Sequence, residues 1–572
     1  MTRRPCDTSR SQLSVGSGSR VSVSPVHTHD VVNQVPAFVG HNLFSSDEVA
    51  VEAMHRWGRA EDVAELTALG SLAGAAQTQA WADDAHRNTP RLVTHDRVGH
   101  RIDEVAYDRS YHDLMRTAVG HGLTAEAWTR PADTGAHLRR AAGFVTWSRA
   151  EAGHLCPISM TYAAAPALRV SPALADRWLP LLASRDYDPE LKPFSDRRSA
   201  IAGMGMTEKQ GGSDVRANVT QAVATPGGPI DGGDTYRLTG HKWFFSAPMS
   251  DVFLVLATTE SGVTCFLVPR VLDDGTRNAL RLQRLKDKLG NRSNASSEVE
   301  FEGAWAVRVG GDGRGIRTII EMVSSTRLDC ILGSSATMRQ ATVRAVHHAR
   351  HRSAFGARLI EQPLMRNVLA DLAIEAEAAE LLGFRLAHAV DAGESELARL
   401  GVALGKFWVC KRTPHLVGEA LECLGGAGYV EENGLARLYR EAPLNSIWEG
   451  SGNVGALDVL RAMTREPASV AALDKELSLA RGHDRRLDLA IDAVPALVAA
   501  AGSDSGAWQA RGIVEHLAVT FQAALLVQHS PHAVADTFIA SRLAEGGPAA
   551  TFGTLGVVGA AEVTQILDRA WS

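Results

Sequence analysis

The spacing of apolar residues changes along the chain and divides it into segments of different expected structure. From about residue 41 to 200 the pattern is mainly helical, with Ala-rich stretches at 60–82 and 138–152 that contain few helix breakers. Residues 1–40 are rich in Ser, Val, Thr and Gly and show little periodicity, which is typical of a flexible tail. We therefore expect an N-terminal helical domain over 41–200, preceded by that tail.

A pattern of short strands begins near residue 201. Four segments rich in β-branched and aromatic residues are separated by turns containing Gly and Asp; they are 235–245, 252–258, 264–268 and 297–301. Such segments are typical of a small antiparallel β domain, which we expect over 201–310.

The helical pattern returns after residue 310. Between 367 and 389, Leu and Ala recur close to the 3.6-residue period of a helix. We expect a helical bundle over 311–465 and an extra, mostly helical C-terminal region over 466–572. The predicted fold class is therefore α+β and mainly α, with one β domain between two helical ones.

Composition and charge narrow the possible functions. The chain has 572 residues, too many for one core, and its 45% hydrophobic and 22% charged residues are ordinary for a globular protein. A net charge of -6 predicts no general attraction to nucleic acid or to anionic membranes. The six cysteines include no CxxC pair, which argues against a zinc site or a disulfide framework and fits a reducing cytoplasm. No run of about 18 apolar residues suggests a membrane span, and no signal peptide is evident.

Two segments of the expected β domain could contact a ligand. In 204–213, paired glycines would let a ligand approach the backbone, and Thr207 and Ser213 offer hydroxyls, although the order of residues is not that of a P-loop. Segment 240–246 ends in three aromatic residues and Ser246, which could flank a flat heteroaromatic ring or fill the core.

A third segment places Glu449 between Trp448 and a Gly-Ser-Gly-Asn run. Burial beside an indole would raise the pKa of this carboxyl and suit it to proton abstraction. The glycines and Asn453 could meet a phosphate or a flavin edge. Alternatively, the segment is a loop that ends a helix, with Glu449 in a salt bridge.

Five motifs, in this order, resemble those of the acyl-CoA dehydrogenase family. They are Thr-Glu-x-x-x-Gly-Ser-Asp at 207–214, Gly-x-Lys-x-aromatic-x-Ser at 240–246, Arg-x-x-Phe-Gly at 352–356, Gly-Gly-x-Gly-Tyr at 425–429 and Trp-Glu-Gly at 448–450. The resemblance implies an FAD enzyme that oxidises an acyl-CoA. The family usually has Pro after Thr-Glu, whereas this chain has Lys209. The runs at 203–215, 285–296 and 438–453 are similar to the AidB-like, alkylation-response branch of the family.

The resemblance also implies roles for individual residues. Glu449 takes the position of the catalytic base that removes the α-proton while hydride passes to the flavin. Some members place the base instead in an early helix of the bundle, at a position that is Thr326 here, and threonine cannot serve. The implied FAD contacts are Met204, Thr207, Ser213, Phe244, Phe245, Ser246, Arg352, Ile447, Trp448, Gly450, Ser451, Gly452 and Asn453. Because the family shares FAD across subunits through Arg352 and the turn at 425–428, a homotetramer is expected.

A second hypothesis is an alkylation-damage-response flavoprotein that binds double-stranded DNA through its C-terminal region, with little or no turnover. Residues 469–572 hold seven basic and eleven acidic residues, a net charge of -4, which argues against this. Only Arg481, Arg485 and Arg486 cluster, and Arg542 is a further candidate contact. No metal is expected: His347 and His351 are one helical turn apart, but no third ligand is indicated, so a solvated helix face is favoured.

Overall fold

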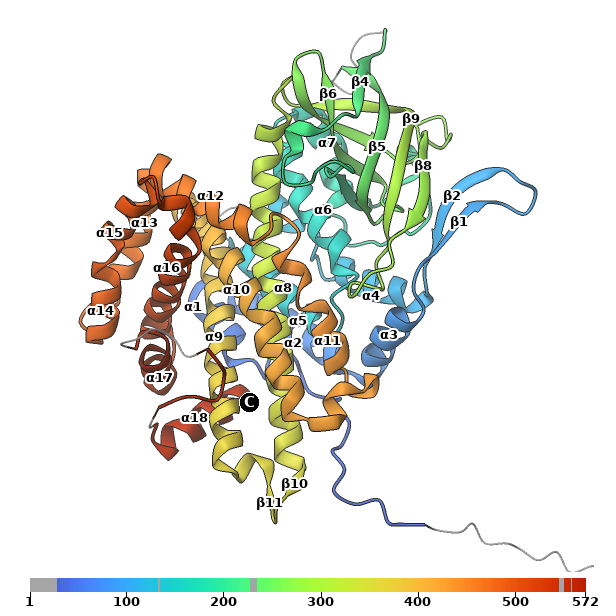
Figure 1. Ribbon diagram of the computed structural model, residues 1–572. Helices are drawn as coiled ribbons and strands as arrows, with labels where there is room; N and C mark the ends of the chain where they lie inside the picture. The colour runs from blue at the N-terminus through green and yellow to red at the C-terminus, as the bar shows by residue number, and fades with distance from the viewer. Residues whose placement is uncertain (1–27, 132–133, 227–233, 545–549, 557, 572) are drawn as a thin grey trace, which may run out of the picture.

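The computed structural model describes residues 28–131, 134–226, 234–544, 550–556 and 558–571. Most of the expected tail, residues 1–27, lies outside the described residues. Residues 28–40 form no helix or strand, are mostly exposed, and lead away from the body of the molecule at their start (Figure 1).

The N-terminal domain is helical, as expected, but also contains a hairpin. Its helices are α1 (Glu48–Trp57), α2 (Ala60–Gly74), α3 (Ala76–Arg87), α4 (Arg109–Gly120), α5 (Ala136–Ser148), α6 (Leu155–Leu168) and α7 (Pro172–Leu182). Strands β1 (Arg91–His95) and β2 (Arg101–Ala106) pair antiparallel and project from the body (Figure 1). The hairpin is anchored from the other domain, because Leu282 N donates to Asp103 Oδ1 at 3.1 Å.

The β domain consists of seven strands that close on themselves. They are β3 (Ala202–Gly205), β4 (Gln221–Ala224), β5 (Thr235–Ser246), β6 (Val252–Thr259), β7 (Gly262–Pro269), β8 (Leu280–Leu285) and β9 (Ser296–Val309). The order is β3-β6-β4-β5-β9-β7, β8 pairs with β9, and β6 also pairs with β7. The sheet is mainly antiparallel, as expected, although β3 and β4 each pair with β6 in parallel.

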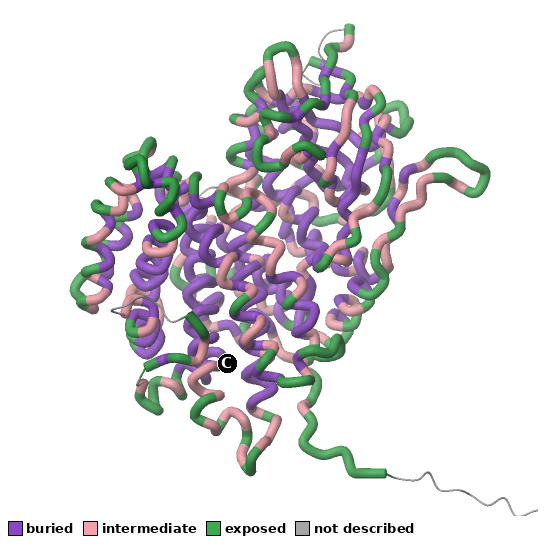
Figure 2. Tube along the Cα trace, in the orientation of Figure 1, coloured by how far each residue is buried: buried purple, intermediate pink, exposed green. Residues whose placement is uncertain are grey.

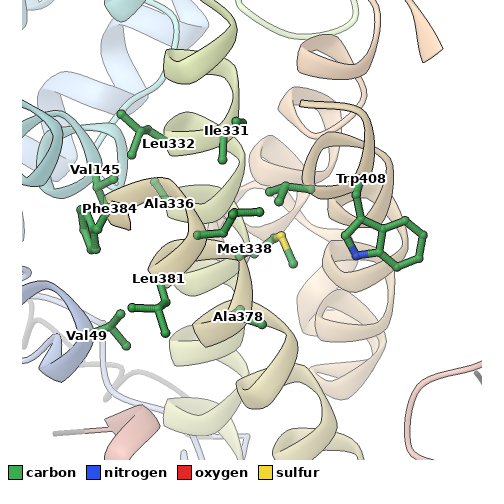
Figure 3. Close-up of a cluster of buried hydrophobic side chains, with 14 of the residues drawn as sticks. Val49, Val145, Ile331, Leu332, Ala336, Met338, Ala378, Leu381, Phe384 and Trp408 are labelled. Carbon is green, nitrogen blue, oxygen red and sulfur yellow. The ribbon is translucent and has the colours of Figure 1, made fainter. Parts of the chain in front are cut away.

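Three long helices form the centre of the bundle: α8 (Gly315–His351), α9 (Pro363–Asp391) and α10 (Ser395–Cys423). The short strands β10 (Ser353–Ala354) and β11 (Ala357–Arg358) lie between α8 and α9, and α11 (Leu435–Glu441) and α12 (Gly452–Arg465) complete the unit. One continuous apolar core joins these helices to the N-terminal domain (Figure 3). Figure 2 shows the buried positions concentrated along these helices and inside the β domain.

The C-terminal region packs on the bundle through α13 (Pro467–Ser478), α14 (Arg485–Asp492), α15 (Val494–Ala501), α16 (Gly506–His529), α17 (His532–Arg542) and α18 (Ala560–Trp571). Buried ion pairs link them: Arg542 contacts Asp371 and Glu375 of α9, each within 2.8 Å. Helix α16 is long and apolar enough to cross a membrane by length and composition, but 72% of its apolar window is buried, as in a core helix.

Candidate active site

A cavity of about 600 Å³ lies where the β domain, helices α5, α6 and α8, and the segment from α11 to α12 meet. Most of the predicted site residues line it. Those that do are Met204, Thr207, Ser213, Phe244, Ser246, Ile447, Trp448, Glu449, Gly450 and Ser451. Segments separated by more than 200 residues therefore share one cavity.

A buried ion pair holds the loop after β3 in place. Lys242 Nζ lies 2.6 Å from Glu208 Oε1, and both side chains are fully buried. The Glu208 carboxylate also accepts from the backbone N–H groups of Val219 at 2.7 Å and Thr220 at 3.2 Å. Since Trp243 N donates to Thr207 O at 2.9 Å, the loop is fixed to β5 as well.

Neighbouring aromatic residues of β5 have different surroundings. The Phe244 ring is half exposed and lines the cavity with Trp243, whose ring lies 3.3 Å from the Lys286 ammonium. Phe245 is fully buried and packs against Phe253 with ring centroids 4.3 Å apart. Phe245 therefore does not line the cavity, and its expected contact with the flavin stays a prediction.

Glu449 lies at the wall of the cavity in a constrained backbone. Its φ is +57°, a left-handed conformation that is uncommon for a residue with a Cβ and is often found at functional sites. Arg327 Nε donates to Glu449 O at 3.0 Å and Lys406 donates to Gly450 O, which together hold this turn. Two cations thus fix the backbone that presents the carboxylate to the cavity, and Arg327 is itself held by Asp458 at 2.7 Å.

The Glu449 carboxylate has one side-chain donor, Thr326, whose Oγ1 lies 2.8 Å from Oε2. The two positions at which the family places its base thus lie side by side. Burial raises the pKa of Glu449, opposed by the Thr326 hydrogen bond and by the charges of Arg327 and Lys406. Ile447, an implied FAD contact, lines the cavity and is 62% exposed.

Four predicted FAD contacts lie outside the cavity lining: Phe245, Arg352, Gly452 and Asn453. Asn453 Oδ1 accepts from Arg511 at 2.9 and 2.7 Å, which ties α12 to α16. Arg352 ends α8 at the opposite side of the bundle and donates to Asn33 O. None of the four lines the cavity of its own subunit, and their contact with FAD stays a prediction.

Sequence reasoning assigned no role to several titratable side chains of the cavity, among them Cys156, Lys288 and Glu441. Lys288 Nζ donates to Asn294 O at 2.6 Å and to Ser296 Oγ at 3.1 Å, and burial lowers its pKa to about 8. Burial raises the pKa of the Cys156 thiol to about 11. Lys288 and Glu441 lie in the segments 285–296 and 438–453, which are similar to the alkylation-response branch of the family. That similarity could have pointed to both residues, but it gave them no role.

The expected solvated face holds for His351, which is exposed, but not for His347. His347 is buried, its Nε2 donates to Pro36 O at 2.8 Å, and its ring stacks on Trp571 with centroids 5.5 Å apart. Elsewhere, His483, His532 and Asp536 place atoms that could bind a metal within 4.8 Å of one another. The pairing of His483 with Asp536 at 2.8 Å explains why these side chains are close.

Comparison with known proteins decides the family. Three family models match: the adaptive response protein AidB N-terminal domain over 33–189, the acyl-CoA dehydrogenase middle domain over 203–304, and the acyl-CoA dehydrogenase C-terminal domain over 313–464. The putative acyl-CoA dehydrogenase AidB of Escherichia coli is 47% identical over 469 residues, covering 81% of this chain and 86% of that protein. The chain belongs to the acyl-CoA dehydrogenase family.

Solved structures agree with this assignment. Caenorhabditis elegans ACDH-11 in complex with C11-CoA superposes with a TM-score of 0.78 at 26% identity, covering 95% of this chain and 93% of that one. A Bacillus anthracis acyl-CoA dehydrogenase complexed with FAD shares the fold, with a TM-score of 0.61 at 18% identity over 80% of this chain and 79% of that one. The expected family, the mainly helical α+β fold and FAD as cofactor are confirmed.

The residues of the cavity fit a bound flavin. The half-exposed Phe244 ring offers an apolar face, the loop at 211–213 offers paired glycines and a hydroxyl, and Ser246 lies 3.3 Å from Ser296 at the strand ends. A planar ring with polar edges requires such a mixture of apolar face and hydrogen-bonding rim. Met204, Thr207, Ser213, Phe244 and Ser246 are the residues that would hold it.

Proposed function

We propose that this AidB-like member of the family oxidises an acyl-CoA between its α- and β-carbons, with Glu449 as the base. The observation that supports this most is the Glu449 carboxylate itself, which faces the FAD cavity, carries a raised pKa and lies beside Thr326. The solved complex of ACDH-11 with C11-CoA supports an acyl-CoA as the substrate class.

In this proposal the protein's own groups move one proton. The ionised Glu449 takes the α-proton of the thioester, and the pair of electrons left on the α-carbon forms the new double bond as hydride leaves the β-carbon. Bound FAD supplies the acceptor for that hydride. Arg327 and Lys406 hold the backbone on both sides of the carboxylate, so the base is positioned before substrate arrives.

The reaction can be tested by anaerobic titration of the yellow holoenzyme with octanoyl-, isovaleryl- and isobutyryl-CoA. We expect at least one thioester to bleach the visible flavin band and to yield the matching enoyl-CoA. Flavin that stays oxidised with every thioester, while dithionite reduces it, would contradict the proposal.

We also propose that the chain forms a homotetramer in which Arg352 and the turn at 425–428 approach the FAD of a neighbouring subunit. Large apolar side chains near these residues support an interface: Phe355 is 100% exposed, Leu364 82% and Tyr429 82%. Light scattering of the FAD-loaded protein tests this, and a monomer would contradict it.

By analogy with the alkylation-response branch, we also propose that the protein is cytoplasmic and takes part in a DNA-damage response. The candidate DNA contacts give it little support. Arg481 and Arg486 are paired with Asp492 at 2.8 Å and Asp484 at 2.6 Å. Arg542 is buried, so the expectation that it could reach a phosphate was wrong. We expect weak, salt-dependent DNA binding at most, measured by mobility shift at two salt concentrations with the Arg481/Arg485/Arg486 triple-Ala variant.

A further inference from the structure

Contacts between α5 and α8 show that the two helices run in parallel along the cavity. Arg140 Nη2 lies 2.9 Å from Asp329 Oδ2, and further along Arg149 Nε donates to Gln340 Oε1 at 3.2 Å. The residues in these two pairs are 189 and 191 positions apart in the sequence. The same offset places Ser148 of α5 opposite Thr337 of α8. Both side chains line the cavity.

The segment through α11 runs antiparallel to α8 on the same cavity. Arg344 Nη1 donates to Asn433 O at 3.2 Å, and Asn445 Nδ2 donates to Ser334 Oγ at 3.0 Å. Residue numbers decrease along the α11 segment in the direction in which they increase along α8. Glu441, which lies between Asn433 and Asn445, is therefore near the level of Thr337 on α8. Ser148, Thr337 and Glu441, which we call the distal triad, therefore meet at one level of the cavity.

The distal triad retains unused hydrogen-bonding capacity although it is buried. Ser148 is 7% exposed, and its Oγ has no hydrogen-bond partner among the described residues. Thr337 donates to Gly333 O at 2.8 Å, which leaves its oxygen free to accept. Among the described residues, Glu441 accepts only from the Asn291 N–H, at 2.8 Å from each oxygen, and burial together with Glu151 raises its pKa to about 7. Buried polar atoms are normally satisfied, so an unpaired hydroxyl on a cavity wall indicates a ligand.

The distal triad lies far from the proposed base. Thr326, which contacts Glu449, and Thr337 are eleven residues apart on α8, or about 16 Å at the rise of a helix. Between these levels the wall includes Cys330, Gly333 and the Phe144 ring, together with Asp329 and Ser334, whose polar groups are paired with Arg140 and Asn445. A chain that entered with its thioester at Glu449 would cross this stretch, whose polar groups already have protein partners, before reaching the distal triad.

We propose that the distal triad is a specificity site for a hydroxyl group near the end of the acyl chain. This rests on the proposed function, because it takes the thioester to lie at Glu449. A hydroxyl can accept from Ser148 while donating to Glu441 or Thr337, which a methyl end cannot. An alkyl end would leave these buried groups unpaired, and such a mismatch is the strongest basis for discrimination between similar substrates.

The test measures binding alone, in the FAD-loaded Glu449→Gln protein. Calorimetry would compare saturated acyl-CoA thioesters from hexanoyl to dodecanoyl with their ω-hydroxy counterparts. We expect one chain length at which the hydroxylated thioester binds roughly tenfold more tightly, as one or two buried hydrogen bonds predict. Adding Ser148→Ala should reduce that ratio to near one, and Glu441→Gln, which replaces a charged acceptor by a neutral one, should reduce it in part.

Ser159→Ala is the matched control, because this cavity serine lies on α6 two residues before Thr161, which accepts from Ala202 N of β3 at 3.0 Å. It should keep the ratio, and the visible flavin spectrum should report an intact cavity in every variant. Equal affinities at all chain lengths, or a ratio that survives in both triad variants or is lost in the control, would overturn the inference and leave the proposed function standing. If no thioester binds at all, both fail.

Discussion

The buried pair of Glu208 and Lys242 offers a test of how the FAD loop is held. Replacing Glu208 by Ala removes the partner of an ammonium that has no access to solvent and also leaves the N–H groups of Val219 and Thr220 without their acceptor. Replacing Lys242 by Met leaves the carboxylate with those two donors and with Gln210 Nε2, which lies 2.7 Å from Oε2. The loss of Glu208 should therefore lower the free energy of unfolding by more than the loss of Lys242.

The magnitude follows from these contacts. Removing one partner of a buried ion pair typically costs about 3–5 kcal/mol, and each orphaned backbone donor adds about 1–3 kcal/mol. Burial lowers the pKa of Lys242 to about 8, so in Glu208→Ala the amine can lose its proton and limit the cost. We expect Glu208→Ala to lower the free energy of unfolding of the β domain by at least about 3 kcal/mol, and Lys242→Met by clearly less.

Urea titration followed by flavin release and by circular dichroism measures both variants, with Glu208→Gln as a control that retains a side-chain acceptor. The double variant Glu208→Ala/Lys242→Met should be more stable than Glu208→Ala alone, because no buried ammonium remains. Equal losses for the two single variants, or a Glu208→Ala protein that keeps FAD at the wild-type urea midpoint, would refute the reasoning.

Three further outcomes are expected. Thr326→Val removes a hydrogen bond that lowers the pKa of Glu449, so the pH at which flavin reduction reaches half its maximal rate should move upward; an unchanged profile would count against Glu449 as the titrating base. Ser246→Ala should weaken FAD retention by about 1–3 kcal/mol, measured by equilibrium dialysis, and unchanged retention would remove Ser246 from the site. Arg542→Ala leaves Asp371 of α9 buried without its cation, while Glu375 keeps its ion pair with Arg412, and should cost about 3–5 kcal/mol in a urea titration, whereas a contact with DNA alone would leave stability unchanged.

Sequence patterns predicted the order of the domains and most segments that meet at the cavity, because helix and strand periods and family motifs are local signals. They could not show which neighbouring aromatic residue of β5 faces the flavin side. The two-residue period of a strand predicts that Phe244 and Phe245 point to opposite faces, but it does not say which of them faces the cavity. The β-bulge between Lys242 and Phe245 also interrupts the alternation from which the face could be assigned.

Partners distant in the sequence escaped prediction for a different reason. Arg542 looked like a candidate phosphate contact, because nothing local reveals that Asp371 and Glu375 of α9 bury it. Similarly, the distal triad comes from three helices, and only their register along the cavity brings Ser148, Thr337 and Glu441 to one level.

The central claim is that Glu449 removes the α-proton of a bound acyl-CoA. It is tested most directly by anaerobic stopped-flow mixing of wild-type and Glu449→Gln proteins, both FAD-loaded, with the thioester that bleaches the wild-type flavin. The glutamine preserves size and polarity but cannot accept the proton, so we predict that the variant binds the thioester and that flavin reduction falls by at least about a hundredfold. Reduction of the Gln variant at the wild-type rate would contradict the account.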